Sequence, residues 1–157
     1  MSALGTVVGL QRSGGGVPKL PVERAEIHLP GMVGDWQRDR RHHGGPERAL
    51  CLYSAELIEA LRLEGHPSAA GAMGENVTIS GLDWSRLQPG ARLTVGTVEM
   101  EITSFAAPCS TIAGAFIDGR FTRANEKVHP GWSRVYARIV CEGVIALGDS
   151  VAITRDS

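Results

Sequence analysis

The stretch TVEMEIT, residues 97–103, decides the fold class of this chain. Val98, Met100 and Ile102 alternate strictly with threonines and glutamates, so one face of the segment is apolar and the other is polar. A period of two is the pattern of a β-strand with one buried face, because successive side chains point to opposite sides of a sheet. The stretch therefore predicts a strand that is buried on one face and wet on the other.

Short runs of the same character lie on both sides of this segment. They are rich in β-branched residues, which fit the pleated surface of a sheet, and glycine-containing turns separate them. The further predicted strands are residues 4–11, 19–29, 48–53, 133–141 and 149–154, with a β-branched run that ends at residue 80. The glycines of residues 13–16 predict a hairpin turn between the first two of these strands.

Helical signals are fewer than strand signals. Ser54 is placed to cap a helix that continues to residue 64 and ends at Gly65, since its apolar residues recur at helical spacing. Shorter helices are expected after Cys109 and around residues 122–128. The sequence therefore favours a mainly β fold with a few short helices. A closed or nearly closed β-barrel is preferred over a sandwich, because 20 glycines and 8 prolines indicate many short strands and closure removes exposed edges.

Length and composition fit one soluble domain. The 157 residues are 43% hydrophobic and 21% charged, with a net charge of −1, and no repeat or long linker divides them. We therefore expect a single domain over residues 1–157, without the global positive charge that nonspecific nucleic-acid binding needs. No apolar run reaches the roughly 18 residues of a membrane span, and the N-terminal stretch lacks the features of a secretory signal. With three well-separated cysteines and no C-x-x-C pair, a cytoplasmic protein without membrane contact is expected.

A basic segment, GDWQRDRRHHGGPER at residues 34–48, holds four arginines around His42, His43, Gly44 and Gly45. Arginine forks match phosphate or carboxylate oxygens, and paired glycines let a backbone approach a ligand closely. An anion-binding site is the functional interpretation. A solvated charged loop accounts for the same residues equally well, and a structural zinc site is the weakest alternative, because adjacent residues seldom bind one metal ion.

A second turn, GAMGENVTIS at residues 71–80, places Glu75 and Asn76 directly before a β-branched run. A glycine-rich turn of this kind needs no function, so a structural role is favoured by this segment alone. The functional interpretation is that the pair orients a neighbouring cation or hydrogen-bonds the edge of a heterocycle.

The three cysteines predict different roles. Cys109 lies in AAPCSTI, where Pro108 restrains the backbone and a helix is expected to begin. A helix N-terminus or a nearby arginine favours the thiolate, which is the form of a cysteine that carries sulfur or binds a soft metal. Cys109 is therefore the candidate nucleophile. Cys51 lies in an apolar run and Cys141 at the end of an alternating strand, so both are predicted to be small core residues.

A second basic cluster covers residues 122–138 and includes Arg123, Lys127 and Arg134. Strand alternation places Arg134 and Tyr136 on one face and apolar residues on the other. The arginine face points either to solvent or into a pocket. Solvent is favoured from this segment alone, because exposed arginines are common on strands.

Taken together, these pieces resemble the MOSC family, named for the C-terminal domain of molybdenum-cofactor sulfurase. The matching stretches follow one another in the family's order and cover nearly all of the chain from Val33 onward. They are GDWQRDRRHHGGPERALCLYS, GAMGENVTISGL, LQPGARLTVGTVEMEIT, APCSTI and GWSRVYARIVCEGVIALGDSV. The HHGG, GEN, Pro-Cys and terminal G-x-x-x-x-GD elements in series make the resemblance specific.

The resemblance implies a β-barrel of the pyruvate-kinase-barrel type and a family cysteine, matched here by Cys109, that carries sulfur or binds molybdenum. Related enzymes reduce N-hydroxylated bases and amidoximes. The chain looks like a stand-alone, bacterial-type member, since no pyridoxal-phosphate sulfurase domain accompanies it. Many relatives carry arginine shortly before the Pro-Cys pair, where this sequence has Ala106 and Ala107. The electrostatic support of Cys109 is therefore expected to come from elsewhere.

The leading hypothesis is a protein that binds the molybdenum-pterin cofactor (molybdopterin) and acts as an oxidoreductase or a sulfur carrier, with Cys109 as metal ligand or persulfide carrier. The residues expected to bind the anionic cofactor are His42, His43, Gly44, Gly45, Glu75, Asn76, Arg123, Lys127 and Arg134. A redox or sulfur-donor protein is the expected partner. A non-catalytic module that delivers the cofactor to other enzymes stays open as the alternative. A cysteine hydrolase using Cys109 with His42 or His43 is less favoured, because no third orienting group is found.

Overall fold

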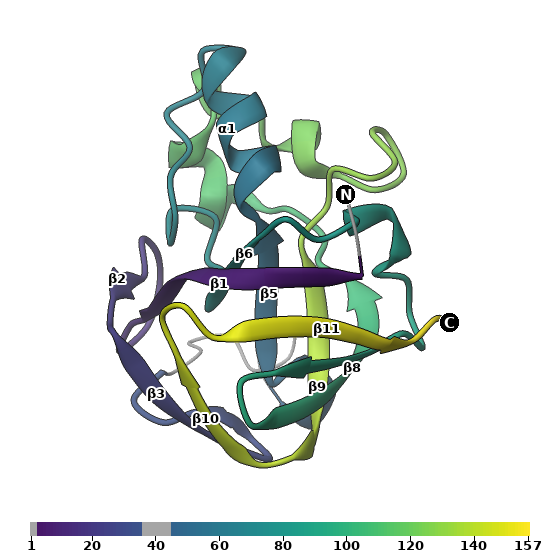
Figure 1. Ribbon diagram of the computed structural model, residues 1–157. Coiled ribbons are helices and arrows are strands. Elements are labelled where there is room, and N and C mark those ends of the chain that lie inside the picture. The colour runs from purple at the N-terminus through teal and green to yellow at the C-terminus, as the bar shows by residue number, and fades with distance from the viewer. Residues whose placement is uncertain (1–2, 36–44) are drawn as a thin grey trace.

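The computed structural model describes residues 3–35 and 45–157, and its main feature is a closed barrel of seven strands (Figure 1). These strands are β1 (Leu4–Arg12), β5 (Leu50–Ser54), β6 (Val77–Ser80), β7 (Arg92–Val95), β8 (Val98–Phe105), β9 (Val135–Cys141) and β11 (Ser150–Arg155). They follow one another around the barrel in the order β11-β7-β8-β9-β5-β6-β1, and β1 pairs with β11 to close it. The predicted mainly β barrel is therefore confirmed.

One strand pair of the barrel differs from the others in direction. β5 and β6 run parallel, with Leu52 opposite Val77, whereas the other neighbouring pairs are antiparallel. Parallel neighbours need a crossover connection, and α1 (Ala55–Leu63) directly follows β5 in this crossover. All five residues of β5 are buried, which agrees with the continuous apolar run that its sequence shows.

The predicted helix is α1, and its cap is the predicted one. The Ser54 hydroxyl accepts a hydrogen bond from the backbone N–H of Leu57 at 3.2 Å, which satisfies one of the free donors of the first turn. Gly65 follows the helix with φ of 98°, a conformation that glycine adopts at low cost. The remaining helices are short 3-10 turns: η1 (Pro46–Arg48), η2 (Trp84–Arg86), η3 (Ser110–Ala115), η4 (Ile117–Gly119) and η5 (Phe121–Ala124). Figure 1 shows α1 beyond one end of the barrel.

A smaller antiparallel sheet lies beside the barrel. It consists of β3 (Arg24–His28), β4 (Gly31–Met32) and β10 (Gly143–Ala146), in the order β10-β3-β4. The short β2 (Leu20–Pro21) pairs with the end of β1, so the turn at residues 13–16 does lie within a hairpin, as predicted. Figure 1 shows β3 and β10 running together below β1.

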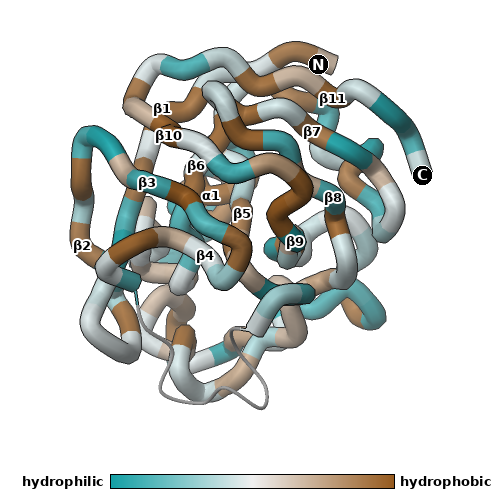
Figure 2. The backbone as a smooth tube through the Cα atoms, turned by 90° about the horizontal axis from the view of Figure 1, so that it is seen from below, coloured by the Kyte–Doolittle hydropathy of each residue, from teal (hydrophilic) through white to brown (hydrophobic). Residues whose placement is uncertain are grey.

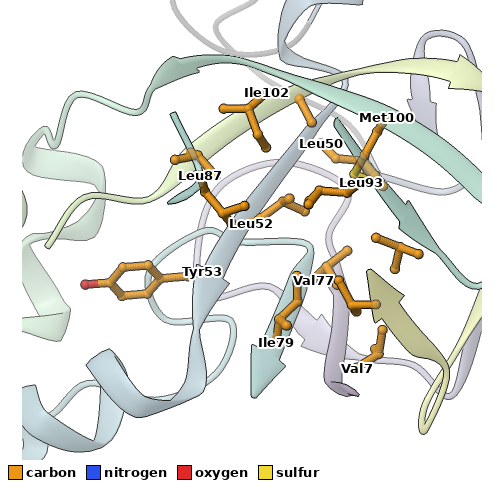
Figure 3. Packing of buried hydrophobic residues seen from close by; sticks show 14 of the residues in the cluster. Val7, Leu50, Leu52, Tyr53, Val77, Ile79, Leu87, Leu93, Met100 and Ile102 are labelled. Carbon is orange, nitrogen blue, oxygen red and sulfur yellow. The ribbon is translucent and has the colours of Figure 1, made fainter. Parts of the chain in front are cut away.

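The barrel interior is filled by apolar side chains. The predicted inward residues of β8, Val98, Met100 and Ile102, are fully buried. Figure 3 shows Met100 and Ile102 among the packed side chains, whereas the ring of Tyr53 points away from them. Viewed from below, the chain carries alternating hydrophobic and hydrophilic segments, as expected for strands with one buried face (Figure 2).

Several predicted boundaries were wrong. The segment predicted as one strand over residues 19–29 is divided into β2 and β3, and the segment 48–53 begins with the end of η1 before β5. The helix expected around residues 122–128 is only the 3-10 turn η5. The strands β4, β7 and β10 were not predicted, because two to four residues between turns are too short for a clear period. None of the helices within the described residues is long and apolar enough to span a membrane.

Candidate functional site

Cys109 lies in the connection between β8 and η3. It is partly buried, its backbone is extended with φ of −146° and ψ of 178°, and η3 begins at the next residue. The expected helix start after Cys109 is therefore present, but as a six-residue 3-10 helix. So short a helix has little dipole of its own, so an electrostatic influence on the thiol has to come mainly from charged side chains.

The side chain of Arg134 reaches the connection between β8 and η3 that contains Cys109. Its Nη2 donates to the carbonyl oxygen of Ala107 at 3.3 Å, two residues before Cys109, and its Nη1 donates to the carbonyl oxygen of Met73 at 2.9 Å. Only 4% of Arg134 is exposed. The solvent position favoured by the strand pattern alone is therefore wrong, because the connections around β9 cover the arginine.

Cys51 is a core residue, as predicted, and it lies near the same guanidinium. It is buried in a small cluster with Ala106 and Tyr136. Burial raises the pKa of the Cys51 thiol, because the charged form is disfavoured away from water, and the positive charges of Arg134 and Lys19 oppose this rise. The thiol is thus kept in its neutral form and is not the reactive one.

Cys141 is exposed, so its predicted core position is wrong. The register between β8 and β9 shifts after Met100, which pairs with Ile139, so that Glu99 pairs with Cys141. The shift breaks the alternation that would have turned Cys141 inward. Its Sγ instead donates to the Glu99 carboxylate at 3.5 Å, and this hydrogen bond is the main reason that the pKa of the Cys141 thiol is raised.

Tyr136 interacts electrostatically with both Cys51 and Cys109. The strand alternation in the sequence had placed it on the same face as Arg134. Its ring is buried and faces the guanidinium of Arg48, whose Cζ lies 5.7 Å from the ring centroid. Burial raises the pKa of the Tyr136 phenol, Cys51 adds to the rise, and the charges of Arg134, Arg48 and Cys109 also act on it. The phenol therefore remains protonated and can donate a hydrogen bond.

Glu75 is fully buried in the turn that Arg134 reaches. Its two carboxyl oxygens accept hydrogen bonds from the backbone N–H of Gly71 and the hydroxyl of Thr78, both at 3.0 Å. Burial raises the pKa of Glu75 to about 7, although these hydrogen bonds and the charge of Arg134 act in the opposite direction. Glu75 is therefore a buried group that changes its charge near neutral pH.

Asn76 is also fully buried, and it joins three parts of the chain. Its side-chain oxygen accepts from the backbone N–H of Cys51 at 3.1 Å, while its amide nitrogen donates to the Gln11 carbonyl at 3.3 Å and to Asp35 at 3.0 Å. A direct contact of Asn76 or Glu75 with a ligand would require these internal bonds to break. Their expected role in orienting a cofactor stays a prediction.

A buried ion pair beside Asn76 was not foreseen from the sequence. Lys19 Nζ lies 2.7 Å from Asp35 Oδ2, and the two side chains are only 4% and 5% exposed. Lysine is rarely buried, and the two residues come from separate connections, so no local pattern announces the pair. Of the two charges, that of Lys19 acts on the Cys51 thiol and lowers its pKa.

Arg123 and Lys127 have different surroundings from Arg134. Arg123 forms a two-pronged ion pair with Glu64, at 2.9 and 2.7 Å, and its Cζ lies 3.8 Å from the ring centroid of Trp132. Lys127 is exposed. The structure therefore gives Arg123 internal partners and leaves Lys127 accessible, and their expected contacts with a cofactor stay predictions.

The structure thus brings Arg134 together with the Cys109 connection and with the turn that contains Glu75. Gly45, the residue before η1, is exposed. His42, His43 and Gly44 lie outside the described residues. Within residues 3–35 and 45–157, no three histidine, cysteine or acidic side chains form a group that could hold a metal ion.

Comparisons with known proteins assign the chain to one family. The family model "MOSC domain" matches residues 39–152, and the chain belongs to this family. It is 26% identical over 140 residues to the uncharacterized protein YflK of Bacillus subtilis, covering 88% of this chain and 62% of that protein. It is 34% identical over 83 residues to protein YiiM of Escherichia coli, covering 50% and 37% respectively. The chain therefore spans less than two thirds of the length of these relatives.

Solved structures show the same fold. The structure of YiiM from Geobacillus stearothermophilus matches 98% of this chain and 75% of that chain, with a TM-score of 0.68 and 24% identity. YiiM from Escherichia coli matches 97% and 71%, with a TM-score of 0.69 and 19% identity. At this identity the likeness concerns the fold alone. It places the chain among β-barrel proteins of the MOSC type.

Proposed function

We propose that this MOSC domain binds the molybdenum-pterin cofactor and acts, through the sulfur of Cys109, as an oxidoreductase for N-hydroxylated compounds or as a sulfur carrier. The observation that supports it is a partly buried thiol in a connection that the buried guanidinium of Arg134 holds. A thiolate suits a soft metal, and a nearby positive charge favours an anionic sulfur. The cytoplasm, where thiols stay reduced, is the proposed location.

The residues around Cys109 fit an anionic group. Arg134 forms no ion pair with any described residue, and its Nε is buried without a hydrogen-bond partner among them. A buried cation without a counter-ion is costly, so an anion at this place would relieve that cost. When bound, the cofactor would supply the redox chemistry of its metal, while the protein holds and orients it.

The other expected residues have proposed roles at the same site. Gly45 belongs to the segment proposed to contact the phosphate-bearing end of the cofactor, as do His42, His43 and Gly44, which lie outside the described residues. Lys127 is accessible for such a contact. Arg123 would have to share its guanidinium between the cofactor and Glu64. Glu75 and Asn76 would act indirectly, by shaping the turn that they hold together. Lys127 and Gly45, which are exposed, are therefore the first residues to test.

The experiment that tests the proposal is metal and pterin analysis of protein purified from a host that makes the cofactor. We expect molybdenum with pterin in the wild type, loss of molybdenum in Cys109→Ser, and unchanged loading in Cys141→Ser, which removes an exposed thiol. Zinc in place of molybdenum, or equal molybdenum in Cys109→Ser, would contradict the proposal. Persulfide on Cys109 without any metal would leave only the sulfur-carrier form of it.

A non-catalytic module that delivers the cofactor is the second candidate, since the same thiol and guanidinium could hold a cofactor in transit. Loaded protein should be mixed with an N-hydroxylated base and a chemical reductant, and the formation of the reduced base measured. Turnover supports the oxidoreductase. Full loading without turnover, followed by transfer of molybdenum to a cofactor-free acceptor enzyme, supports delivery, and the acceptor or donor protein would then be the expected partner.

A further inference from the structure

Arg134 holds the polypeptide on the N-terminal side of Cys109 with both its backbone and its side chain. Its carbonyl oxygen accepts a hydrogen bond from the backbone N–H of Ala106 at 2.9 Å. Its Nη2 donates to the carbonyl oxygen of the next residue, Ala107, at 3.3 Å. The only residue between this pair and Cys109 is Pro108, whose ring fixes its own φ. The backbone before Cys109 is therefore restrained at three consecutive residues, Ala106, Ala107 and Pro108.

The same guanidinium reaches the other side of the thiol through a second connection. Its Nη1 donates to the carbonyl oxygen of Met73 at 2.9 Å. At the neighbouring Gly74, an added Cβ would lie 3.8 Å from Arg134 Nη1 and 3.9 Å from Ile112 Cγ2. Ile112 is a buried residue of η3, three residues after Cys109. Arg134 thus ties the residues before Cys109 to a turn that lies against the residues after it.

The charge of Arg134 has little compensation inside the protein. Its neighbours Cys51 and Tyr136 are both groups that burial keeps neutral. Glu75 is the described acidic group on which its charge acts, and no ion pair joins the two. A planar guanidinium can bridge two carbonyl oxygens and still present its positive charge, which a single amine cannot do with the same geometry. An arginine is therefore better suited than a lysine to join the two connections at this place.

We infer that Arg134 is a positioning residue for Cys109: it bridges the carbonyls of Ala107 and Met73 and thereby fixes the place of the connection that carries the sulfur. The inference rests on the proposed function of Cys109, but not on any bound metal.

The test uses the cofactor-free protein and compares Arg134→Met and Arg134→Lys with Arg138→Met. Arg138 lies in β9, the strand that begins directly after Arg134, and it pairs with Glu101 at 3.2 Å. Iodoacetamide is added at one fixed neutral pH, and mass spectrometry of peptides gives the labelling rate of each cysteine. Exposed Cys141 serves as the internal standard for reagent, and labelling of buried Cys51 reports unfolding.

We expect the ratio of Cys109 to Cys141 labelling to rise about tenfold in Arg134→Met and about threefold in Arg134→Lys, because the connection that carries Cys109 is then no longer held and its partly buried sulfur becomes accessible. Arg138→Met should leave the ratio unchanged. If Cys51 is labelled in Arg134→Met, that variant is unfolded and the lysine variant decides. An unchanged or lower ratio in a folded Arg134→Lys would overturn the inference, whereas missing molybdenum in the wild type would overturn only the proposed function.

Discussion

The buried carboxyl of Glu75 predicts how the stability of the fold depends on pH. The pKa of Glu75 is raised from its ordinary value of 4.5 to about 7, mainly because burial disfavours the carboxylate. A carboxyl with a higher pKa in the folded chain binds more protons when folded than when unfolded. Stability is therefore lost as the pH rises from about 4.5 to about 7. At about 1.4 kcal/mol per pKa unit, this loss amounts to about 3 kcal/mol.

Glu75→Gln removes the titration and keeps the shape of the side chain. The hydroxyl of Thr78 now donates to Glu75, and it can rotate to accept from the new amide instead. Urea unfolding at several pH values should show the variant gaining about 3 kcal/mol over the wild type between pH 4 and pH 8. Glu59→Gln, on the exposed face of α1, is the control and should show no such gain. A constant difference between Glu75→Gln and wild type across this range would refute the reasoning.

Four other substitutions separate reactive from structural residues. Cys109→Ser should remove cofactor or persulfide loading at an unchanged melting temperature, whereas Cys51→Ala should lower the free energy of unfolding by about 1–3 kcal/mol; equal thermal losses in both would contradict this division. Lys19→Met should cost about 3 kcal/mol in urea unfolding, because it leaves the buried Asp35 without its cation, and a neutral result would mean that the pair is not formed. Arg123→Met should lower the free energy of unfolding by about 1 kcal/mol, because the ion pair with Glu64 is partly exposed and the guanidinium stacks on the single ring of Trp132. An unchanged free energy of unfolding with weakened cofactor binding would instead assign Arg123 to the site.

The fold could be predicted from the sequence wherever one local pattern decided the structure. The alternation in β8 and the Ser54 cap of α1 are properties of a few neighbouring residues, and both are present as expected. The exposure of Cys141 could not be predicted, because it depends on a register shift between two strands that the alternating pattern does not encode. The same holds for β7 and β10, which are only four residues long and depend on their partners in the sheets.

The site was predictable in its residue types but not in its connections. The sequence singled out Cys109 and Arg134 and predicted that support for the thiol comes from outside its own segment. It could not decide whether the arginine faces solvent, since alternation gives the face of a strand but not what covers that face. The buried position of Arg134 depends on the carbonyls of Met73 and Ala107, which lie 61 and 27 residues away in the chain.

The placement of the buried ionisable groups supports a functional rather than a stabilising reason for them. Lys19, Glu75 and Arg134 are buried within the described chain, as is the side chain of Asp35, and the first three act electrostatically on the same thiol, Cys51. Buried charges generally stabilise a fold less than well-packed apolar residues of similar size. If they served stability, they would have no reason to gather at one place while the rest of the barrel interior stays apolar. Their gathering around Arg134, which also holds the Cys109 connection, agrees with the proposed site for an anionic group.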